Sequence, residues 1–419
     1  MNFRQYSAMT KCVIPNRVTL SDTSFYQKFY YMDNLIHVQI PNSVTNISNT
    51  YYNCRNLIDS PICGDNVTSM NGTYRGCWSL TGSPVCGGNV TDMSYTYFGC
   101  SDLTGSPVCG EKVISMSHTY SGCSNLTGSP VCGEKVTDMS GTYYDCSNLT
   151  GSPVCGNNVT NMSRTYGSCH RLIGPPVCGE KVTDMSDTYY FCQLTGSPVC
   201  GNNVTNMHNT YYYCYNLTGS PVCGEKVTDM SNTYYNCRNL TGSPACGEKV
   251  TNMRGTYYNC FNLTGSPICG NNVTDMSNTY RNCRKLTGSP ICGEKVTNMS
   301  GSYSDCFNLT GSPICGENVT DMSYTYDSCY NLTGNAYFYS SNVSNMKACF
   351  AYKNNARVLR IYLPANSITN TTAHITNYDS IVGESITWTI EGTYSYNTKY
   401  NIYLYPVANV AEARAANGD

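Results

Sequence analysis

Cysteines recur along this chain at fixed spacing, and they are the residues whose type and placement could most readily do chemistry. One series runs from Cys54 to Cys329 and a second from Cys63 to Cys315, each with a period of 23 residues apart from one step of 22. Two further cysteines bring the total to 27. Thiols at regular spacing can stay free in a core, form disulfides, or bind a metal ion.

The sequence leaves these three thiol states open. A disulfide within each repeat unit, such as Cys54 with Cys63, needs an oxidising compartment, and no export signal points to one. Metal binding normally uses paired CxxC or Cys/His ligands, which are lacking here. The first series is typical of small apolar residues stacked in a core. We therefore expect free thiols and no metal site.

Catalytic groups of other kinds are sparse. The five histidines lie in unrelated phases of the repeat, so no nucleophile, base and orienting group can be assembled from them. No glycine-rich phosphate loop is present. Charged residues make up 12% of the 419 residues, and the formal net charge of −2 includes no basic field for nucleic acid. We expect a protein that is not an enzyme, takes no cofactor and binds no nucleic acid.

The element that must position these residues is a 23-residue repeat. A unit this short cannot bury its own apolar face, so neighbouring units must stack on a shared core. The sequence predicts a solenoid of about fourteen coils, counting a degenerate last copy. The opening valines of the units are Val44, Val67, Val90, Val113, Val136, Val159, Val182, Val204, Val227, Val250, Val273, Val296, Val319 and Val343.

Each unit combines fixed and variable positions, which we number as offsets from its opening valine. In VTDMSNTYYNC, the copy that starts at Val227, the fixed offsets are 0, 3, 6, 7 and 10. Offsets 3, 6, 7 and 10 share one face of a helical turn, which predicts that they point inward and that offsets 5, 8 and 9 point outward. The LTGSPVC segment of each unit predicts a brief strand followed by a corner.

The repeat resembles a known family. NLIHVQIPNSVTNISNTYYNC at residues 34–54 and the later VTDMSNTYYNCRNL units are similar to the BspA-type leucine-rich repeat of bacterial surface proteins. The resemblance implies a right-handed leucine-rich-repeat solenoid, with one short parallel strand per coil that starts at Leu240 and its equivalents. It also implies adhesion and ligand binding. Three departures are Ser243 and Pro244 inside that strand, tyrosine in place of the usual phenylalanine, and the second cysteine.

The location of the protein is also an expectation. The N-terminal MNFRQYSAMTKCVIPNRV has no apolar stretch long enough for a secretory signal, and no run of residues is apolar enough to insert into a membrane. Similar arrays occur in bacteriophage proteins, and a phage origin would explain the missing signal because virion parts are released by lysis. We expect a protein that is extracellular or exposed on a virion.

The positions that vary between copies are the candidate binding residues. These positions are offsets 5, 8 and 9 and offset 11, which directly follows the first cysteine of each unit. They are rich in Tyr, Arg, Trp, His and Asn, which suit binding surfaces. Free drift of exposed positions is the alternative, because solvated sites tolerate most substitutions. The candidates are Arg75, Trp78, Tyr95, Phe98, His118, Tyr144, Arg164, His170, Tyr190, Tyr212, Tyr215, Tyr235, Tyr258, Phe261 and Arg281.

Three regions follow from these patterns. Residues 1–43 form an N-terminal cap with a first irregular coil, 44–342 form the solenoid, and 343–419 hold a degenerate last coil and a β-rich segment. That last segment is either a cap or a module for attachment, homo-oligomerisation or virion assembly. The whole predicts a non-enzymatic protein that binds a cell-surface glycan or protein through its variable strip. The competing prediction is a purely structural virion or surface-layer element without a ligand.

Overall fold

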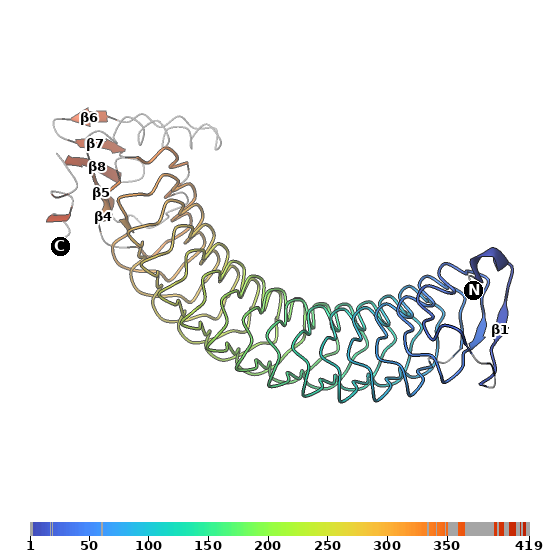
Figure 1. Cartoon of the computed structure of the whole chain (residues 1–419). Coiled ribbons are helices and arrows are strands. Elements are labelled where there is room, and N and C mark those ends of the chain that lie inside the picture. The colour runs from blue at the N-terminus through green and yellow to red at the C-terminus, as the bar shows by residue number, and fades with distance from the viewer. Residues whose placement is uncertain are drawn as a thin grey trace. The chain divides into compact units, whose positions relative to one another are not determined.

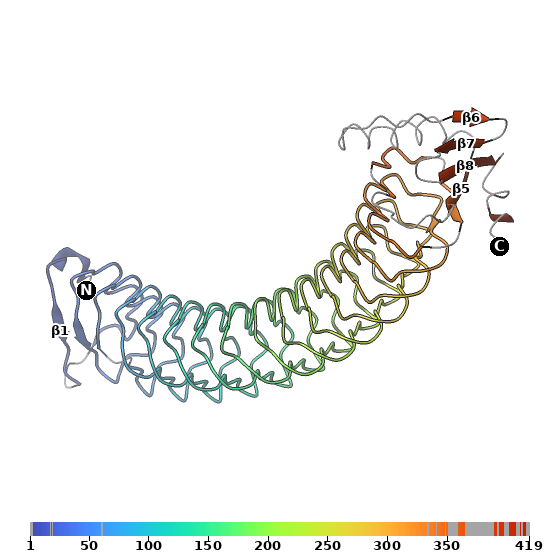
Figure 2. The same ribbon diagram turned by 180° about the vertical axis from the view of Figure 1, so that it is seen from behind.

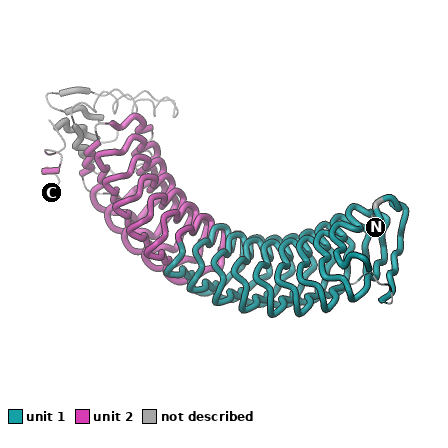
Figure 3. The backbone as a smooth tube through the Cα atoms, viewed as in Figure 1, with its two compact units in different colours: residues 1–204 teal, residues 205–419 magenta. Residues whose placement is uncertain are grey.

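The structure is a computed structural model. It describes residues 3–16, 18, 20–59, 62–332, 335–340, 342–347, 349–350, 359–364, 389–391, 394–397, 402–407, 411 and 414–415. The chain divides into two compact units, residues 1–204 and 205–419 (Figure 3). Each unit, taken by itself, contains a stack of similar backbone coils (Figures 1 and 2). The repeat solenoid expected from the sequence is therefore confirmed within each unit.

Few regular elements occur outside the coils. Unit 1 begins with the 3₁₀ helix η1 (Phe3–Tyr6), and its strand β1 (Lys11–Val13) pairs in parallel with β2 (His37–Gln39). Unit 2 ends in a sheet of order β3-β4-β5-β8-β7-β6. Its strands are β3 (Ile314–Cys315), β4 (Ala336–Phe338), β5 (Leu359–Pro364), β6 (Thr389–Glu391), β7 (Tyr394–Asn397) and β8 (Ile402–Val407).

The C-terminal strands continue the last coil. Strand β4 pairs in parallel with β3 on one side and with β5 on the other, so the edge of the final coil is covered by backbone pairing. Strand β8 pairs in parallel with β5, whereas the β8–β7 and β7–β6 pairs are antiparallel. The β-rich character expected after residue 354 is present, whereas the choice between a cap and an attachment module stays a prediction.

The backbone N–H groups of each coil donate alternately to the next coil and to their own coil. In the unit that opens at Val227, the N–H groups at offsets 3, 5, 7 and 9 donate to carbonyls of the next coil at 2.7–3.0 Å. The N–H groups at offsets 6, 8 and 10 donate to the carbonyl three residues earlier in their own coil. The offset 4 N–H of Ser231 donates to the Asp229 carboxylate at 2.8 Å. Every donor from offset 3 to 10 is thus used, which allows this segment to stack in the interior of the array.

This alternation replaces the helical turn that the sequence predicts. Offsets 5 and 9 have positive φ in the described copies, for example 53° at Asn232 and 61° at Asn236. A left-handed residue in every fourth position interrupts any helix, so the segment becomes a chain of turns. The predicted inward face is nevertheless correct, because turns of this kind also bring offsets 0, 3, 6, 7 and 10 to one side.

The core is the fixed set of residues. Val227, Met230, Thr233, Tyr234 and Cys237 are all 0% exposed, and so is Leu240. Equivalent residues of the other copies are buried in the same way, which confirms the stacking prediction. Some outward assignments are wrong. Asn236 is 3% exposed, and its amide oxygen accepts a hydrogen bond from Asn259 of the next coil. At offset 8, Ser121 and Ser304 are 4% and 0% exposed.

Candidate functional site

The core tyrosine fixes the opposite wall of its coil. The Tyr234 hydroxyl donates to the Val222 carbonyl at 2.8 Å and accepts from the Val222 N–H at 3.0 Å. One side chain therefore hydrogen-bonds both the N–H and the carbonyl of a residue in the LTGSPVC segment. This corrects the predicted strand at Leu217 and Leu240: among the described residues, this part of the repeat pairs as a strand in β2, β3 and β4, near the two ends of the array. Phenylalanine, which has no hydroxyl, takes this position in the two terminal copies, where Phe29 stacks on Tyr51 and Phe350 stacks on Tyr326.

The fixed hydroxyls and thiols are structural. Thr233 Oγ1 lies 2.8 Å from the carbonyls of both Met207 and Met230, and Cys237 Sγ lies 3.1 Å from the Tyr211 carbonyl. Burial raises the pKa of the Cys237 thiol and that of the Tyr257 hydroxyl, so both groups stay protonated.

The cysteines carry no reactive site. All 27 are free in the structure, in line with the expected thiol state. The second series is mostly half-buried, and burial raises the pKa of Cys86 to about 12, which keeps a nucleophilic thiolate from forming near neutral pH. Over the described part of the chain, no three His, Cys, Asp or Glu side chains are grouped to hold a metal ion.

Backbone conformation accounts for part of the variable composition. Glycine, asparagine and aspartate are the residues that adopt positive φ at least cost, and they fill most of offsets 5 and 9. Asparagine is therefore enriched at these offsets because the backbone conformation favours it. Free drift of exposed positions under this backbone constraint would give the same enrichment. Some copies have a bulky residue at these offsets that does not favour positive φ. These residues are Tyr95, Arg164, Phe191, Tyr213 and Tyr324, and their φ lies between 56° and 61°.

All fifteen candidates reach the surface. Trp78, Tyr144, Arg164 and His170 are exposed, and the other eleven are partly exposed. None belongs to the core, so the variable strip is displayed as expected. Whether it binds a ligand stays a prediction at this point.

In unit 2, several candidates form a stacked row. Tyr212 and Tyr235 stack at 4.8 Å between ring centroids, Tyr235 and Tyr258 stack at 4.4 Å, and the Arg281 guanidinium lies 5.8 Å from the Tyr258 ring. Partial burial and then the nearby hydroxyls of Tyr258 and Tyr212 raise the pKa of Tyr235 to about 12. We call Tyr212, Tyr235, Tyr258 and Arg281 the offset-8 row.

A second row in unit 2 was only half identified from the sequence. Arg238 lies between Tyr215 and Phe261, at 5.0 and 5.6 Å from the ring centroids. Arg284 lies between Phe261 and Phe307, at 4.8 and 5.6 Å. Phe307 then stacks on Tyr330 at 5.3 Å. We call this set, Tyr215, Arg238, Phe261, Arg284, Phe307 and Tyr330, the offset-11 ladder.

The two rows of unit 2 are joined by contacts. Tyr213 packs against Tyr212, Tyr235 and Tyr215, with centroids 4.7–5.7 Å apart. At the other end, Arg284 Nε donates to Asn282 Oδ1 at 2.8 Å. Asn282 in turn donates to Asn259, and Asn259 donates to Asn236, both at 2.7 Å. The offset-8 row and the offset-11 ladder therefore border a continuous surface with an asparagine row between them.

Unit 1 gathers its candidates differently. The Arg75 guanidinium lies over the rings of Tyr95 and Phe98 at 4.9 and 5.0 Å, and Tyr95 stacks on His118 at 4.9 Å. Burial lowers the pKa of His118, which favours the neutral ring in this stack. Trp78 lies against Arg55 at 4.7 Å.

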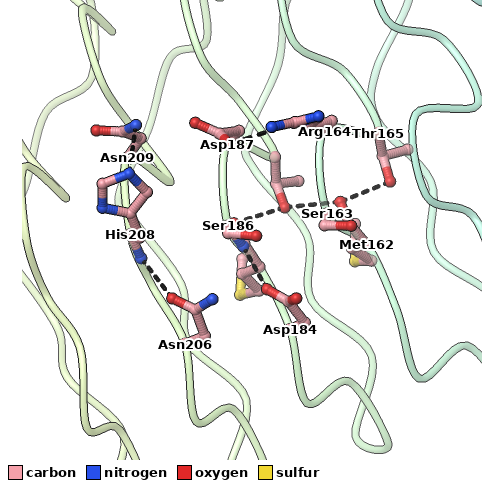
Figure 4. Close-up of polar contacts among 12 residues, drawn as sticks. Met162, Ser163, Arg164, Thr165, Asp184, Ser186, Asp187, Asn206, His208 and Asn209 are labelled. Carbon is pink, nitrogen blue, oxygen red and sulfur yellow. Dashed lines mark hydrogen bonds and ion pairs between the residues drawn. The ribbon is translucent and has the colours of Figure 1, made fainter.

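The remaining candidates make separate contacts. Arg164 Nε lies 3.5 Å from Asp187 Oδ2, one of the unit 1 contacts drawn in Figure 4. His170 Nδ1 lies 3.1 Å from the Phe191 carbonyl, and Tyr190 packs edge-on against Phe191 at 4.5 Å. The unit 2 contacts in Figure 4 are the His208 N–H to Asn206 Oδ1 at 3.0 Å and Asn209 Nδ2 to His208 Nε2 at 2.8 Å. Tyr144 contacts the Gly167 backbone, where a Cβ would lie 2.9 Å from its ring.

The ladder residues that were not among the predicted candidates are Arg238, Arg284, Phe307 and Tyr330. The signal was present, because offset 11 reads Tyr, Arg, Phe, Arg, Phe, Tyr over six consecutive copies from residue 215 to residue 330. The alternation of cation and ring becomes visible once neighbouring copies are known to be in contact. Over the described residues, no helix has the length and apolar character to cross a membrane.

Comparisons with known proteins give a family match and two structural likenesses. Residues 228–359 match the family described as "Mycoplasma protein of unknown function, DUF285". A leucine-rich repeat protein from Bacteroides ovatus is 16% identical, with 88% of this chain and 89% of that chain covered and a TM-score of 0.47. A leucine-rich cell surface protein from Faecalibacterium prausnitzii is 16% identical, with 79% and 88% covered and a TM-score of 0.38.

The comparison with curated proteins finds no match. A bacteriophage origin finds no support in the family match or in the two structures. The resemblance stated from the repeat is confirmed: this chain is similar to leucine-rich repeat proteins of the BspA type, and its residues 228–359 match the Mycoplasma family of unknown function.

Proposed function

We propose that the chain is a non-enzymatic binding protein, in which the coils present the variable offsets to a glycan or protein on a cell surface. The observation that carries this proposal is the presence of bulky side chains in left-handed conformation. Tyr95, Arg164, Tyr213 and Tyr324 occupy positions where Gly or Asn stands in other copies. A non-glycine residue there costs on the order of 1 kcal/mol, so retaining these side chains works against stability.

Surface chemistry supports the same proposal. Tyrosine and arginine supply large contact areas and hydrogen-bond donors with few rotatable bonds, and they dominate binding hot spots. In the offset-8 row the ring faces of Tyr235 are covered by its neighbours Tyr212 and Tyr258. The row therefore offers ring edges and hydroxyls to a ligand rather than open ring faces.

The test replaces the offset-8 row with residues the repeat already tolerates. Serine occupies offset 8 at Ser121 and Ser304, so the triple variant Tyr235→Ser, Tyr258→Ser, Arg281→Ser should fold. We expect binding to host cells to fall at least tenfold, with the melting temperature within a few degrees of the parent. Glycosidase or protease treatment of the cells then separates a glycan ligand from a protein ligand.

The matched control is Lys249→Ser with Lys295→Ser, which removes exposed cations from another corner of the same unit. This control should bind as the parent does. Unchanged binding by the triple variant, with its fold intact, would instead favour the structural element without a ligand.

A further inference from the structure

The offset-11 ladder contains two cations that form no ion pair with the described residues. Arg238 and Arg284 are exposed, and neither forms an ion pair with any described residue. Other arginines do: Arg164 pairs with Asp187, and Arg414 pairs with Glu317 at 2.8 Å. Arg284 uses its Nε on Asn282, and its terminal NH₂ groups, like the guanidinium of Arg238, have no carboxylate partner among the described residues and can donate to an external anion.

Aromatic rings of the flanking coils lie on either side of each of these cations. Each guanidinium lies between two rings of adjacent coils, at centroid distances of 4.8–5.6 Å. A guanidinium that stacks through its faces directs its N–H groups outward from its edge, where they can form paired hydrogen bonds with a carboxylate or sulfate. The rings thus reduce the entropy that binding would otherwise cost.

The spacing of the cations selects the kind of anion. Arg238 and Arg284 stand two coils apart, on the order of 10 Å for coils with β-type spacing. Nucleic acid is a poor match, because each strand of a duplex carries one charge per about 3.4 Å along the axis. An extended polysaccharide is a good match, because one sugar spans about one coil, and a chain charged on alternate sugars then meets one arginine per disaccharide.

From this geometry we infer that the offset-11 ladder, Tyr215 to Tyr330, binds an acidic polysaccharide that carries one carboxylate or sulfate per disaccharide and lies along the stack of coils. The inference rests on the proposed binding function and deepens it by naming the ligand class and the residues that recognise it. Asn282, Asn259 and Asn236 border the ladder and bond to one another and to Arg284, so they brace its position.

The test measures binding of the full chain to three probes. These are hyaluronan fragments, which carry a carboxylate on alternate sugars, the same fragments with the carboxyl groups reduced to alcohols, and polygalacturonate, which is charged on every sugar. We expect the alternating polymer to bind at least tenfold tighter than the reduced form, with affinity falling as salt is raised. Arg238→Gln with Arg284→Gln should weaken that binding about tenfold for each arginine removed.

Two controls decide between recognition and general charge attraction. Lys249→Gln with Lys295→Gln makes the same charge change elsewhere in the unit and should leave binding unchanged. Phe261→Ser should weaken binding several-fold while both arginines remain, because Arg238 and Arg284 both lose a stacking partner. Equal loss in the lysine variant, or binding of polygalacturonate and polyglutamate in proportion to charge alone, would overturn the inference.

The two proposals can fail separately. If the arginine variant binds cells and hyaluronan as the parent does, while the offset-8 serine variant loses cell binding, the polysaccharide assignment is wrong and the binding function stands. If neither variant changes cell binding and no probe binds, both proposals fail.

Discussion

Two tyrosine rows run side by side in unit 2, one residue apart in sequence, and they differ in burial and in what their hydroxyls bond. The core row, which includes Tyr234, Tyr257 and Tyr280, stacks with centroids 5.4–5.6 Å apart, and the offset-8 row stacks at 4.4–4.8 Å. Ring stacking is therefore common to both. In unit 2 the core hydroxyls, for example those of Tyr234, Tyr257 and Tyr280, bond to the opposite wall of the coil. The core row keeps tyrosine in every copy from Val44 to Val319, whereas offset 8 does not.

This difference shows what fixes a residue in such an array. A stacked ring by itself is replaceable, as Arg75, Ser121 and Gly167 demonstrate at offset 8. A buried hydroxyl that hydrogen-bonds both an N–H and a carbonyl cannot be replaced so easily. Its loss leaves two buried polar groups without partners. The variable row is thus free to change for recognition.

The largest expected difference between the two regions comes at alkaline pH. Burial raises the pKa of the core tyrosines, for example Tyr257 and Tyr280, and of thiols such as Cys260 and Cys283. Their unfolded forms ionise near pH 8.5 for cysteine and about 10 for tyrosine. Because the folded pKa values are raised, stability is complete below about pH 8 and falls steeply above it.

Circular dichroism and phenolate absorbance, followed together against pH, check this prediction. Most of the phenolate signal should appear with unfolding, and the offset-8 serine variant should unfold at the same pH as the parent. Core tyrosines that ionise near pH 10 in a folded protein would contradict it.

The next effect concerns the fixed threonine. Thr233→Val keeps the shape but removes one buried donor from the Met207 and Met230 carbonyls, which still accept from Thr210 and Thr256, at a cost of about 0.5–1.5 kcal/mol of unfolding free energy. The exposed Thr228→Val removes a bond to the Thr205 carbonyl where water can replace it, and should cost under about 0.5 kcal/mol. Chemical denaturation of both variants checks the difference, and equal costs would count against the core role of offset 6.

The smallest effect has the opposite sign. Arg164 is held at φ 57° and is largely exposed, with one long contact to Asp187. Arg164→Asn should stabilise the chain by up to about 1 kcal/mol, because asparagine adopts this conformation more readily and a surface ion pair contributes little. Arg75→Asn, at offset 8 where φ is not positive, should bring no gain. A loss of stability in Arg164→Asn, seen as a lower melting temperature, would mean that the side chain stabilises the fold.

The sequence was sufficient for the repeat and the buried set, but not for every outward position, since Asn236 and Ser304 are buried. Periodicity identified Val227, Met230, Thr233, Tyr234 and Cys237 as inward, because identity between copies reports a shared packing environment. It could not show that the inward face is built from turns, since turns and a helix bring the same offsets together. The glycine and asparagine content of offsets 5 and 9 did carry that information, because these residues favour positive φ.

The site was harder to predict than the core. The offset-11 ladder depends on contacts between residues that are 23 positions apart in the sequence. No role can be inferred for a residue such as Arg284 from its own copy alone. Its role appears only when Phe261 and Phe307 of the flanking coils are placed on either side. Likewise, the hydroxyl bond from Tyr234 to Val222 joins opposite walls of one coil, which no local pattern of residues reveals.

The central claim, that a hydroxyl bond rather than ring stacking separates the fixed row from the variable one, is tested most directly by the unfolding free energies of Tyr234→Phe and Tyr235→Phe. We predict a loss of about 1–3 kcal/mol for the first and under about 0.5 kcal/mol for the second. Tyr51→Phe is the internal control, because the buried Tyr51 hydroxyl has no hydrogen-bond partner, and its removal should cost nothing. Equal losses for Tyr234→Phe and Tyr235→Phe would contradict the account.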